Sequence, residues 1–203
     1  MTKILVTQSF GFVKYFCEQY GGTAHTNSLA IYDYLKKVVC FSTRNEAQPN
    51  IRFWQTAHNS FVLKKPCYIV SVSDVKDINI AQPASCFHTE VGQSSYLWSN
   101  GKLSNQTIKS LASETGIQSD SDSEHLLHYM ILKGDLSIVK EPFSCVIIHM
   151  GNMYVARSDN GILYTDELMS FSTEKFDDSY PVMNNKVFQI DFISETTKIE
   201  SVF

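Results

Sequence analysis

The sequence lacks the features that would place it in a membrane or on nucleic acid. No stretch approaches ~18 uninterrupted apolar residues, the length that a transmembrane helix needs. The 17 basic residues are outnumbered by 21 acidic ones, so the chain carries a net charge of -4 and no basic footprint for nucleic acid. The N-terminus has no long apolar segment with a small-residue cleavage site, unlike a signal peptide. We therefore expect a cytoplasmic protein that binds neither nucleic acid nor membrane.

Paired cysteines and clustered metal ligands are also missing. The five cysteines are odd in number and form no C-x-x-C motif, so free thiols in a reducing compartment are expected. Most would be small buried hydrophobes, and Cys17 and Cys40 lack the local signature of a nucleophile. His125 and His128 stand three residues apart on an expected helix, but no further ligands have suitable spacing. We expect no metal and no cofactor.

What the sequence does contain is enough apolar material for one domain. The chain has 203 residues, of which 43% are hydrophobic, ample for one core and short for two. No internal repeat and no linker-like change in composition divides it. We therefore expect a single domain over residues 1–203.

The hydrophobic patterns predict a mixed fold. Helices are predicted over 105–115, ending at Gly116, and over 121–133, ending at Gly134, because glycine favours helix C-termini. A helix is also predicted after Asn27-Ser28, over 29–35, and a β-hairpin over 51–63. Strands are predicted over 4–6, 68–72, 95–98, 143–149, 153–157, 162–164 and 186–193. Strands, two central helices and then strands favour an α+β sandwich of antiparallel sheets over a doubly wound parallel sheet.

Four motifs follow one another through the middle of the chain. They are Ile80-Ala81-Gln82-Pro83, the strand that ends at Asn100-Gly101, the helix start Asp122-Ser123-Glu124, and Ala156-Arg157-Ser158-Asp159-Asn160-Gly161. The series resembles the class II (N-terminal-nucleophile) glutamine amidotransferase domain, as in asparagine synthetase and glutamate synthase. That family shows an A-Q-P turn, a strand ending in N-G, a D-[ST]-E helix start and an A-R-D-x-x-G hairpin. The resemblance covers residues 80–165 well and implies a four-layer αββα sandwich, the fold of N-terminal-nucleophile hydrolases.

The resemblance also implies a nucleophile at the start of the chain. In the family this residue is a cysteine whose own α-amino group takes the proton, and an α-amine with a pKa near ~8 suits that task. Here Thr2 would become N-terminal after removal of the initiator methionine, which places a hydroxyl beside a free amine. Threonine and α-amine pairs act as nucleophiles in other hydrolases of this kind. Alternatively, Thr2 is an ordinary β-branched strand residue.

Three further residues match the family's substrate site. Asn100 and Gly101 match the oxyanion hole, where a side-chain amide and a backbone N–H stabilise developing negative charge. Asn-Gly is also a common turn, so structure alone would explain the pair. Asp122 matches the carboxylate that holds the substrate's ammonium group. It is equally explained as a first-turn acid of a helix capped by Ser121.

The arginine that clamps the substrate α-carboxylate in the family has no clear counterpart. Counting back from Gln82 places Ser71 near its position, and no arginine lies between Arg52 and Arg157. Arg52 lies in a segment similar to the R-W-x-T-H form of the motif, although it is far upstream. It is therefore the candidate for binding substrate, with a solvated surface charge as the alternative. A bidentate guanidinium contact is what a carboxylate clamp requires.

Two functions follow from this pattern. The first is a stand-alone amidotransferase-like domain without glutaminase activity that acts as a regulatory module through a protein partner. Such a small degenerate version of a metabolic domain would suit a phage genome, by analogy alone. The second is an amidohydrolase with Thr2 as nucleophile, which would act through an acyl-enzyme on a small amide substrate other than free glutamine.

Overall fold

Two antiparallel sheets form the centre of the molecule. The structure is a computed structural model that describes residues 2–45, 48–74, 76, 83–88, 93–192 and 196–200. Within these residues sheet A has the strand order β11-β9-β10-β1-β4-β2-β3, and sheet B the order β13-β12-β8-β7-β6-β5. Sheet A consists of β1 (Lys3–Thr7), β2 (Thr26–Asp33), β3 (Val38–Asn45), β4 (Pro66–Ser73), β9 (Tyr164–Thr165), β10 (Phe171–Ser172) and β11 (Tyr180–Pro181). Sheet B consists of β5 (Ala84–His88), β6 (Gln93–Asn100), β7 (Ser144–His149), β8 (Asn152–Arg157), β12 (Lys186–Asp191) and β13 (Thr196–Glu200).

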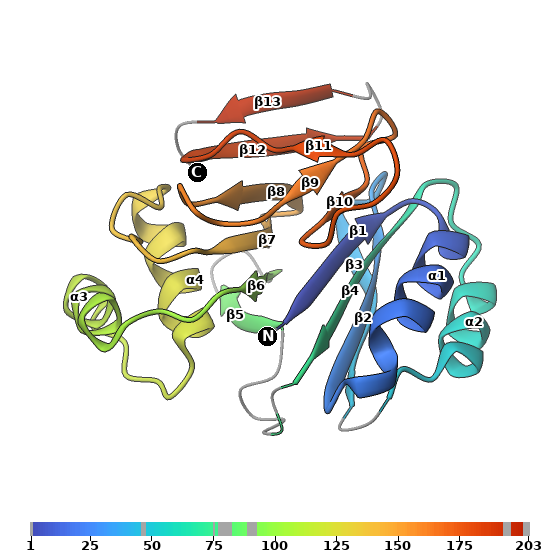
Figure 1. Cartoon of the computed structure of the whole chain (residues 1–203), viewed down its shortest axis with the longest axis horizontal. Helices are drawn as coiled ribbons and strands as arrows, with labels where there is room; N and C mark the ends of the chain where they lie inside the picture. Colours follow the sequence, from blue (N-terminus) through green and yellow to red (C-terminus); the bar gives the residue numbers. More distant parts are fainter. Residues whose placement is uncertain are drawn as a thin grey trace.

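Helices cover the outer face of each sheet (Figure 1). The helices α1 (Phe10–Tyr20) and α2 (Ile51–Ser60) pack on sheet A, and α3 (Asn105–Thr115) and α4 (Asp122–Lys133) pack on sheet B. Along β1, Ile4 and Val6 join the core between the sheets while Leu5 joins the core under α1, as the two-residue period of a strand requires. The predicted four-layer αββα sandwich is confirmed.

The two central helices begin and end at the predicted residues. The Ser104 side chain accepts from Thr107 N–H at the start of α3, and Ser121 accepts from Glu124 N–H at the start of α4. Gly116 and Gly134 end these helices in the left-handed conformation, both with φ of 72°. Capping residues and C-terminal glycines therefore predicted these boundaries correctly.

Two of the predicted elements are wrong, and the strand predicted over 162–164 is displaced to Tyr164–Thr165. The segment predicted as a helix over 29–35 lies mainly in β2, every residue of which is buried. Because β2 lies inside sheet A and is covered on both faces, apolar residues follow one another without alternation, and this pattern resembles a buried helix. The segment predicted as a hairpin over 51–63 contains α2, which begins where the Asn50 side chain accepts from Phe53 N–H at 3.0 Å.

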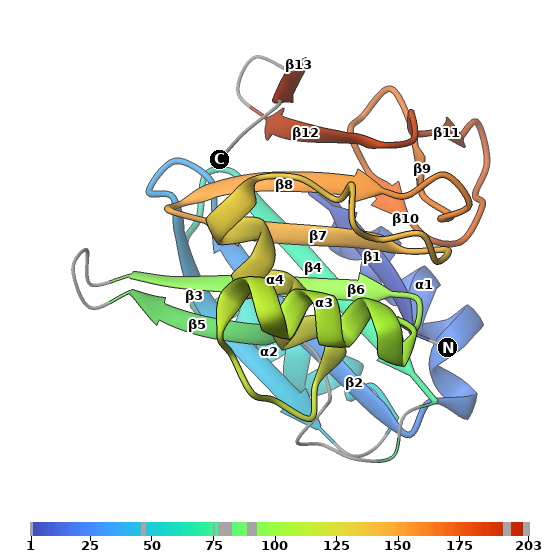
Figure 2. The same cartoon turned by 90° about the vertical axis from the view of Figure 1, so that its left-hand side faces the viewer.

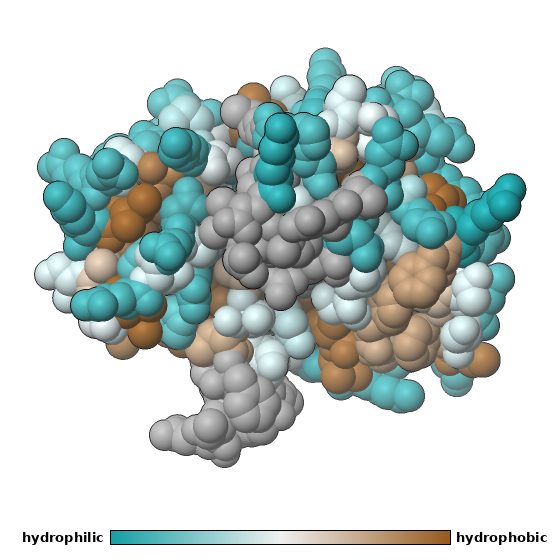
Figure 3. Space-filling view, turned by 90° about the horizontal axis from the view of Figure 1, so that it is seen from below, coloured by the Kyte–Doolittle hydropathy of each residue, from teal (hydrophilic) through white to brown (hydrophobic). Residues whose placement is uncertain are grey.

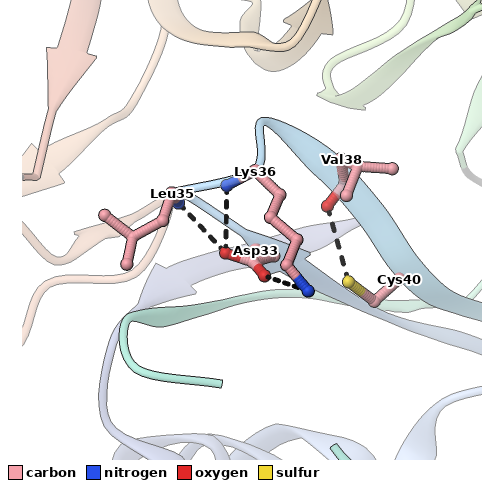
Figure 4. A network of polar contacts seen from close by, with 5 residues as sticks. All are labelled: Asp33, Leu35, Lys36, Val38 and Cys40. Carbon is pink, nitrogen blue, oxygen red and sulfur yellow. Dashed lines mark hydrogen bonds and ion pairs between the residues drawn. The ribbon is translucent and has the colours of Figure 1, made fainter. Parts of the chain in front are cut away.

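A tight turn connects β2 to the edge strand β3 (Figure 4). The buried Asp33 carboxylate accepts hydrogen bonds from the N–H groups of Leu35 and Lys36 at 3.0 and 3.2 Å. Lys36 Nζ lies 3.8 Å from the same carboxylate. Asp33 thus satisfies the turn's backbone donors and closes the hairpin.

Among the residues that the structure describes, no helix is both long enough and apolar enough to cross a membrane.

Candidate functional site

The start of β1 lies beside the end of β6. Thr2 precedes β1, which lies between β10 and β4 inside sheet A, and Asn100 ends β6, which lies between β7 and β5 inside sheet B. Figures 1 and 2, two views at right angles, both place the beginning of the chain next to the end of β6. Figure 3 shows the molecule from below, with hydrophobic side chains gathered on the right, the side on which α1 and α2 lie in Figure 1. The fold thus brings the two regions together in the way that the resemblance implies.

Hydroxyl side chains form the sheet A wall of this site. Thr2 Oγ1 lies 2.9 Å from Ser73 Oγ, and Ser71 Oγ lies 2.7 Å from Ser28 Oγ on the neighbouring strand. Ser71 and Ser73 follow Ile69 at two-residue steps, and Ile69 belongs to the core between the sheets, so both serines face sheet B. The hydroxyls satisfy one another's hydrogen-bonding capacity, as buried polar groups must.

Asn100 and Gly101 form the sheet B wall. Asn100 is 8% exposed and follows Trp98, a residue of the core between the sheets, by two positions, so it faces sheet A. Gly101 has φ of 131°, a conformation that other residues rarely adopt. A Cβ at this position would collide with the Pro142 carbonyl oxygen and lie 2.9 Å from the Phe143 ring. Close packing therefore requires glycine here, whatever chemistry the peptide group performs.

Asp122 belongs to the same wall. It is the first residue of α4, and its Oδ2 accepts a hydrogen bond from Leu103 N–H at 3.3 Å, two residues beyond Gly101. Next to it, Ser123 Oγ lies 2.6 Å from Ser99 Oγ and joins α4 to β6. The carboxylate is half-buried and retains further acceptor positions, because an ionised carboxylate has about four lone pairs. Its position fits both an ammonium ligand and a first-turn helix acid.

Arg52 is not brought to this site. It is exposed on α2, in the helical layer on the far side of sheet A from sheet B. Ser71, at the position where the resemblance places the arginine, is 3% exposed and bonded to Ser28. Ala81 and Gln82 of the predicted A-Q-P turn lie outside the described residues.

The other candidates from the sequence have structural roles. Burial, with the nearby Glu18 carboxylate, raises the pKa of the Cys17 thiol to about 12, so this cysteine stays protonated. The pKa of Cys40 is also raised, chiefly by burial. His125 is 3% exposed, and its Nε2 lies 2.9 Å from the Ser119 carbonyl oxygen, so it secures the turn before α4. The described residues contain no cluster of three side chains of the metal-binding kinds.

Ser28 and Ser73 were not identified from the sequence. The signal was the alternation of small hydroxyl residues, Thr26 and Ser28 on one strand and Ser71 and Ser73 on the next. The helix predicted over 29–35, with Asn27-Ser28 at its start, conceals the alternation of Thr26 and Ser28 on β2.

Comparisons with known proteins identify the fold. No protein-family model and no curated protein sequence matches the chain. Among solved structures, glutamine phosphoribosylpyrophosphate amidotransferase from B. subtilis, complexed with ADP and GMP, matches with a TM-score of 0.68 and 19% identity over 98% of this chain and 49% of that one. An allosteric regulatory enzyme of purine biosynthesis matches with a TM-score of 0.67 and 19% identity over 98% of this chain and 48% of that one.

A third structure matches along nearly its whole length. It is a glutamine aminotransferase class-II domain protein from Silicibacter pomeroyi, with a TM-score of 0.52, 11% identity, and 98% of both chains covered. By contrast, the chain spans about half the length of the first two amidotransferases. The chain has the fold of the class II glutamine amidotransferase domains.

Proposed function

We propose that this chain is an amidotransferase-like domain that does not hydrolyse free glutamine and acts by binding a protein partner. The observation that carries the proposal is the buried Ser71–Ser28 pair at the position where the family's arginine would stand. A hydroxyl offers one donor and no charge, whereas a guanidinium offers a bidentate, charge-assisted contact to a carboxylate. Free glutamine would lose the contact that orients its α-carboxylate.

The position of the substituted residues supports the same proposal. Arg52 lies in the segment that is similar to the R-W-x-T-H form of the family's arginine motif. Its side chain is exposed on α2, in the outer helical layer. Thr2 carries a secondary hydroxyl in place of the family's thiol, and this hydroxyl is hydrogen-bonded to Ser73. A hydroxyl is a weaker nucleophile than a thiol and depends fully on a neighbouring base.

One geometric observation favours the second function, an N-terminal-threonine amidohydrolase. Thr2 lies at the sheet end where Asn100, Gly101 and Asp122 also lie. With Met1 removed, the α-amine of Thr2 would take the hydroxyl proton. Oγ1 would then attack an amide carbon, and the Asn100 side-chain amide with the Gly101 N–H would stabilise the oxyanion. The substrate would be an amide that needs no arginine clamp.

The two functions differ in a direct assay. Ammonia release from L-glutamine and from a neutral primary amide is measured for the wild-type protein, for Thr2→Ala and for the exposed control Thr23→Ala, after intact mass has established the N-terminus. The proposal predicts no release above the Thr2→Ala background with either substrate. Release from the neutral amide that disappears in Thr2→Ala and Asn100→Ala, and persists in Thr23→Ala, would establish the amidohydrolase instead.

A further inference from the structure

A second concave surface lies away from the Thr2 site, where the edge of sheet A meets β12. It is a groove of about 360 Å³ between the β9–β10 turn and the segment that joins β11 to β12, and these elements lie at the upper right in Figure 1. Its lining includes Met169, Phe171 and Val182, which are at most 6% exposed and belong to the core between the two sheets. The floor of the groove is therefore part of the apolar core between the two sheets.

Exposed apolar side chains surround this groove. Tyr180 and Met183 line it and are 51% and 56% exposed, and Leu168 at the tip of the β9–β10 turn is 80% exposed. Aromatic residues and methionine are enriched at protein interfaces, and methionine adapts its shape to different partners. Apolar exposure gathered around a groove marks an interaction site more strongly than the same residues scattered singly.

The charged residues of the groove are all acidic. Asp166 and Glu167 line it, and among the residues that the structure describes no lysine or arginine does, although the Arg157 guanidinium lies behind Val182. The following segment, 170–180, adds Glu174, Asp177 and Asp178 against one lysine, Lys175. Glu174 is engaged by Lys3 at 2.9 Å. The remaining acidic side chains favour a basic ligand, by electrostatic complementarity.

Internal hydrogen bonds fix the backbone on both sides of the groove. Arg157 on β8 donates from Nε to the Val182 carbonyl at 2.5 Å and from Nη1 to the Gly161 carbonyl at 2.6 Å. Asp166 Oδ1 accepts from Ser170 N–H at 2.7 Å and fixes the β9–β10 turn. A groove held in this way costs little ordering entropy when a ligand binds.

We propose that this groove binds a basic segment of a partner protein, with an apolar side chain of that segment inserted between Tyr180 and Met183. The proposal rests on the proposed function, because it gives the protein partner a surface and a chemistry. A second copy of this chain is the poorer occupant, because each copy has a net charge of -4 and would meet like charge at the groove.

Fluorescence anisotropy with defined peptides tests the proposal. The probe is a labelled Lys-Leu-Lys-Leu-Lys-Leu peptide, and the matched controls are Glu-Leu-Glu-Leu-Glu-Leu and Lys-Ser-Lys-Ser-Lys-Ser. The wild-type protein is expected to bind the first peptide and neither control. Met183→Lys places a long side chain in the groove and adds a positive charge that repels the lysines of the peptide. It should weaken binding about tenfold or more. Glu167→Gln should weaken it about threefold and reduce its salt dependence.

Leu132→Lys is the control variant, because Leu132 is 59% exposed on α4 and outside the groove. It should bind the peptide like the wild type, and thermal unfolding checks that all three variants fold. Absence of Lys-Leu binding, equal binding of the Glu-Leu peptide, or unchanged binding by Met183→Lys would overturn the proposal. If the wild-type protein does not bind the peptide but self-associates, and Met183→Lys abolishes this self-association, the proposal would be overturned in favour of a second copy of the chain as the occupant.

The outcome is separable from that of the proposed function. The same wild-type preparation is assayed for ammonia release from glutamine. Release that depends on Thr2 would refute the proposed function whatever the peptide does. Absence of both ammonia release and peptide binding would refute only the assignment of this groove.

Discussion

The two walls of the candidate site differ in how well they match the amidotransferase pattern. The sheet B wall contains Asn100, Gly101 and Asp122, all three at positions that the resemblance implies. The sheet A wall contains hydroxyls at the positions where the resemblance implies a thiol and a guanidinium, with Ser71 bonded to Ser28. Close packing on Pro142 and Phe143 requires glycine at position 101. On sheet A, by contrast, the small hydroxyl side chains form hydrogen bonds with one another and need no ligand as a partner. Packing alone can therefore keep glycine at position 101, whatever the chemistry of the opposite wall.

The largest expected effect tests whether packing fixes the sheet B wall. Gly101→Ala should destabilise the protein by about 3 kcal/mol or more, because it combines a strained φ with a steric collision. Gly22→Ala is the control, since a Cβ at Gly22 would meet no atom within 4 Å. Urea unfolding of both variants measures the difference. Similar stability of the two would show that packing does not require glycine at position 101.

An intermediate effect tests whether the sheet A hydroxyls support each other. Ser71→Ala and Ser28→Ala should each cost about 1–2 kcal/mol, because each leaves the other hydroxyl buried without its partner. The double variant should cost less than the sum of the two, by about 1 kcal/mol. Chemical unfolding of the four proteins in the cycle measures this coupling. Strictly additive losses would mean that the pair contributes no mutual stabilisation.

The smallest effect concerns Glu141, whose carboxylate accepts hydrogen bonds at the start of α3. Burial alone would raise the pKa of Glu141, but hydrogen bonds from Ser104 and Thr107 outweigh it and lower the pKa to about 2. A lowered pKa means that the ionised form stabilises the fold above the ordinary value of 4.5, and that this stability is lost as the pH falls toward 2.

Glu141→Gln should therefore cost about 1 kcal/mol at neutral pH, after allowance for solvent screening of a partly exposed group. The difference from the wild type should shrink as the pH falls from 4.5 toward 2, in thermal unfolding measured along a pH series. A constant difference across that range would mean that charge at Glu141 contributes nothing.

The sequence predicted the elements whose ends carry local signals. Ser104 and Ser121 cap α3 and α4, Gly116 and Gly134 end them, and the Asn100-Gly101 pair ends β6. The sequence did not predict β2, because a strand buried on both faces has no alternation. The sequence also did not predict that residues 51–60 form the helix α2, because the helix is stabilised by packing of Trp54 and Ala57 on sheet A.

From the sequence, the resemblance names Thr2 on the sheet A wall and three candidate residues on the sheet B wall. There, Asn100 and Gly101 adjoin in sequence, and Asp122 stands at a recognisable helix start. On the sheet A wall the partners of each residue come from separate strands, so the pairing of Thr2 with Ser73 across 71 positions required the fold. The placement of Arg52 on the outer layer likewise became visible only when α2 was identified.

The proposed function requires that the site lacks a clamp for the α-carboxylate of free glutamine. NMR titration of the ¹⁵N-labelled protein with L-glutamine tests it most directly, with the Asn100 side-chain amide and the Gly101 N–H as reporters. Without a clamp, neither resonance should shift as glutamine is added. Saturable shifts of both resonances that are absent in an Asp122→Ala variant would show that free glutamine occupies the site, and would contradict it.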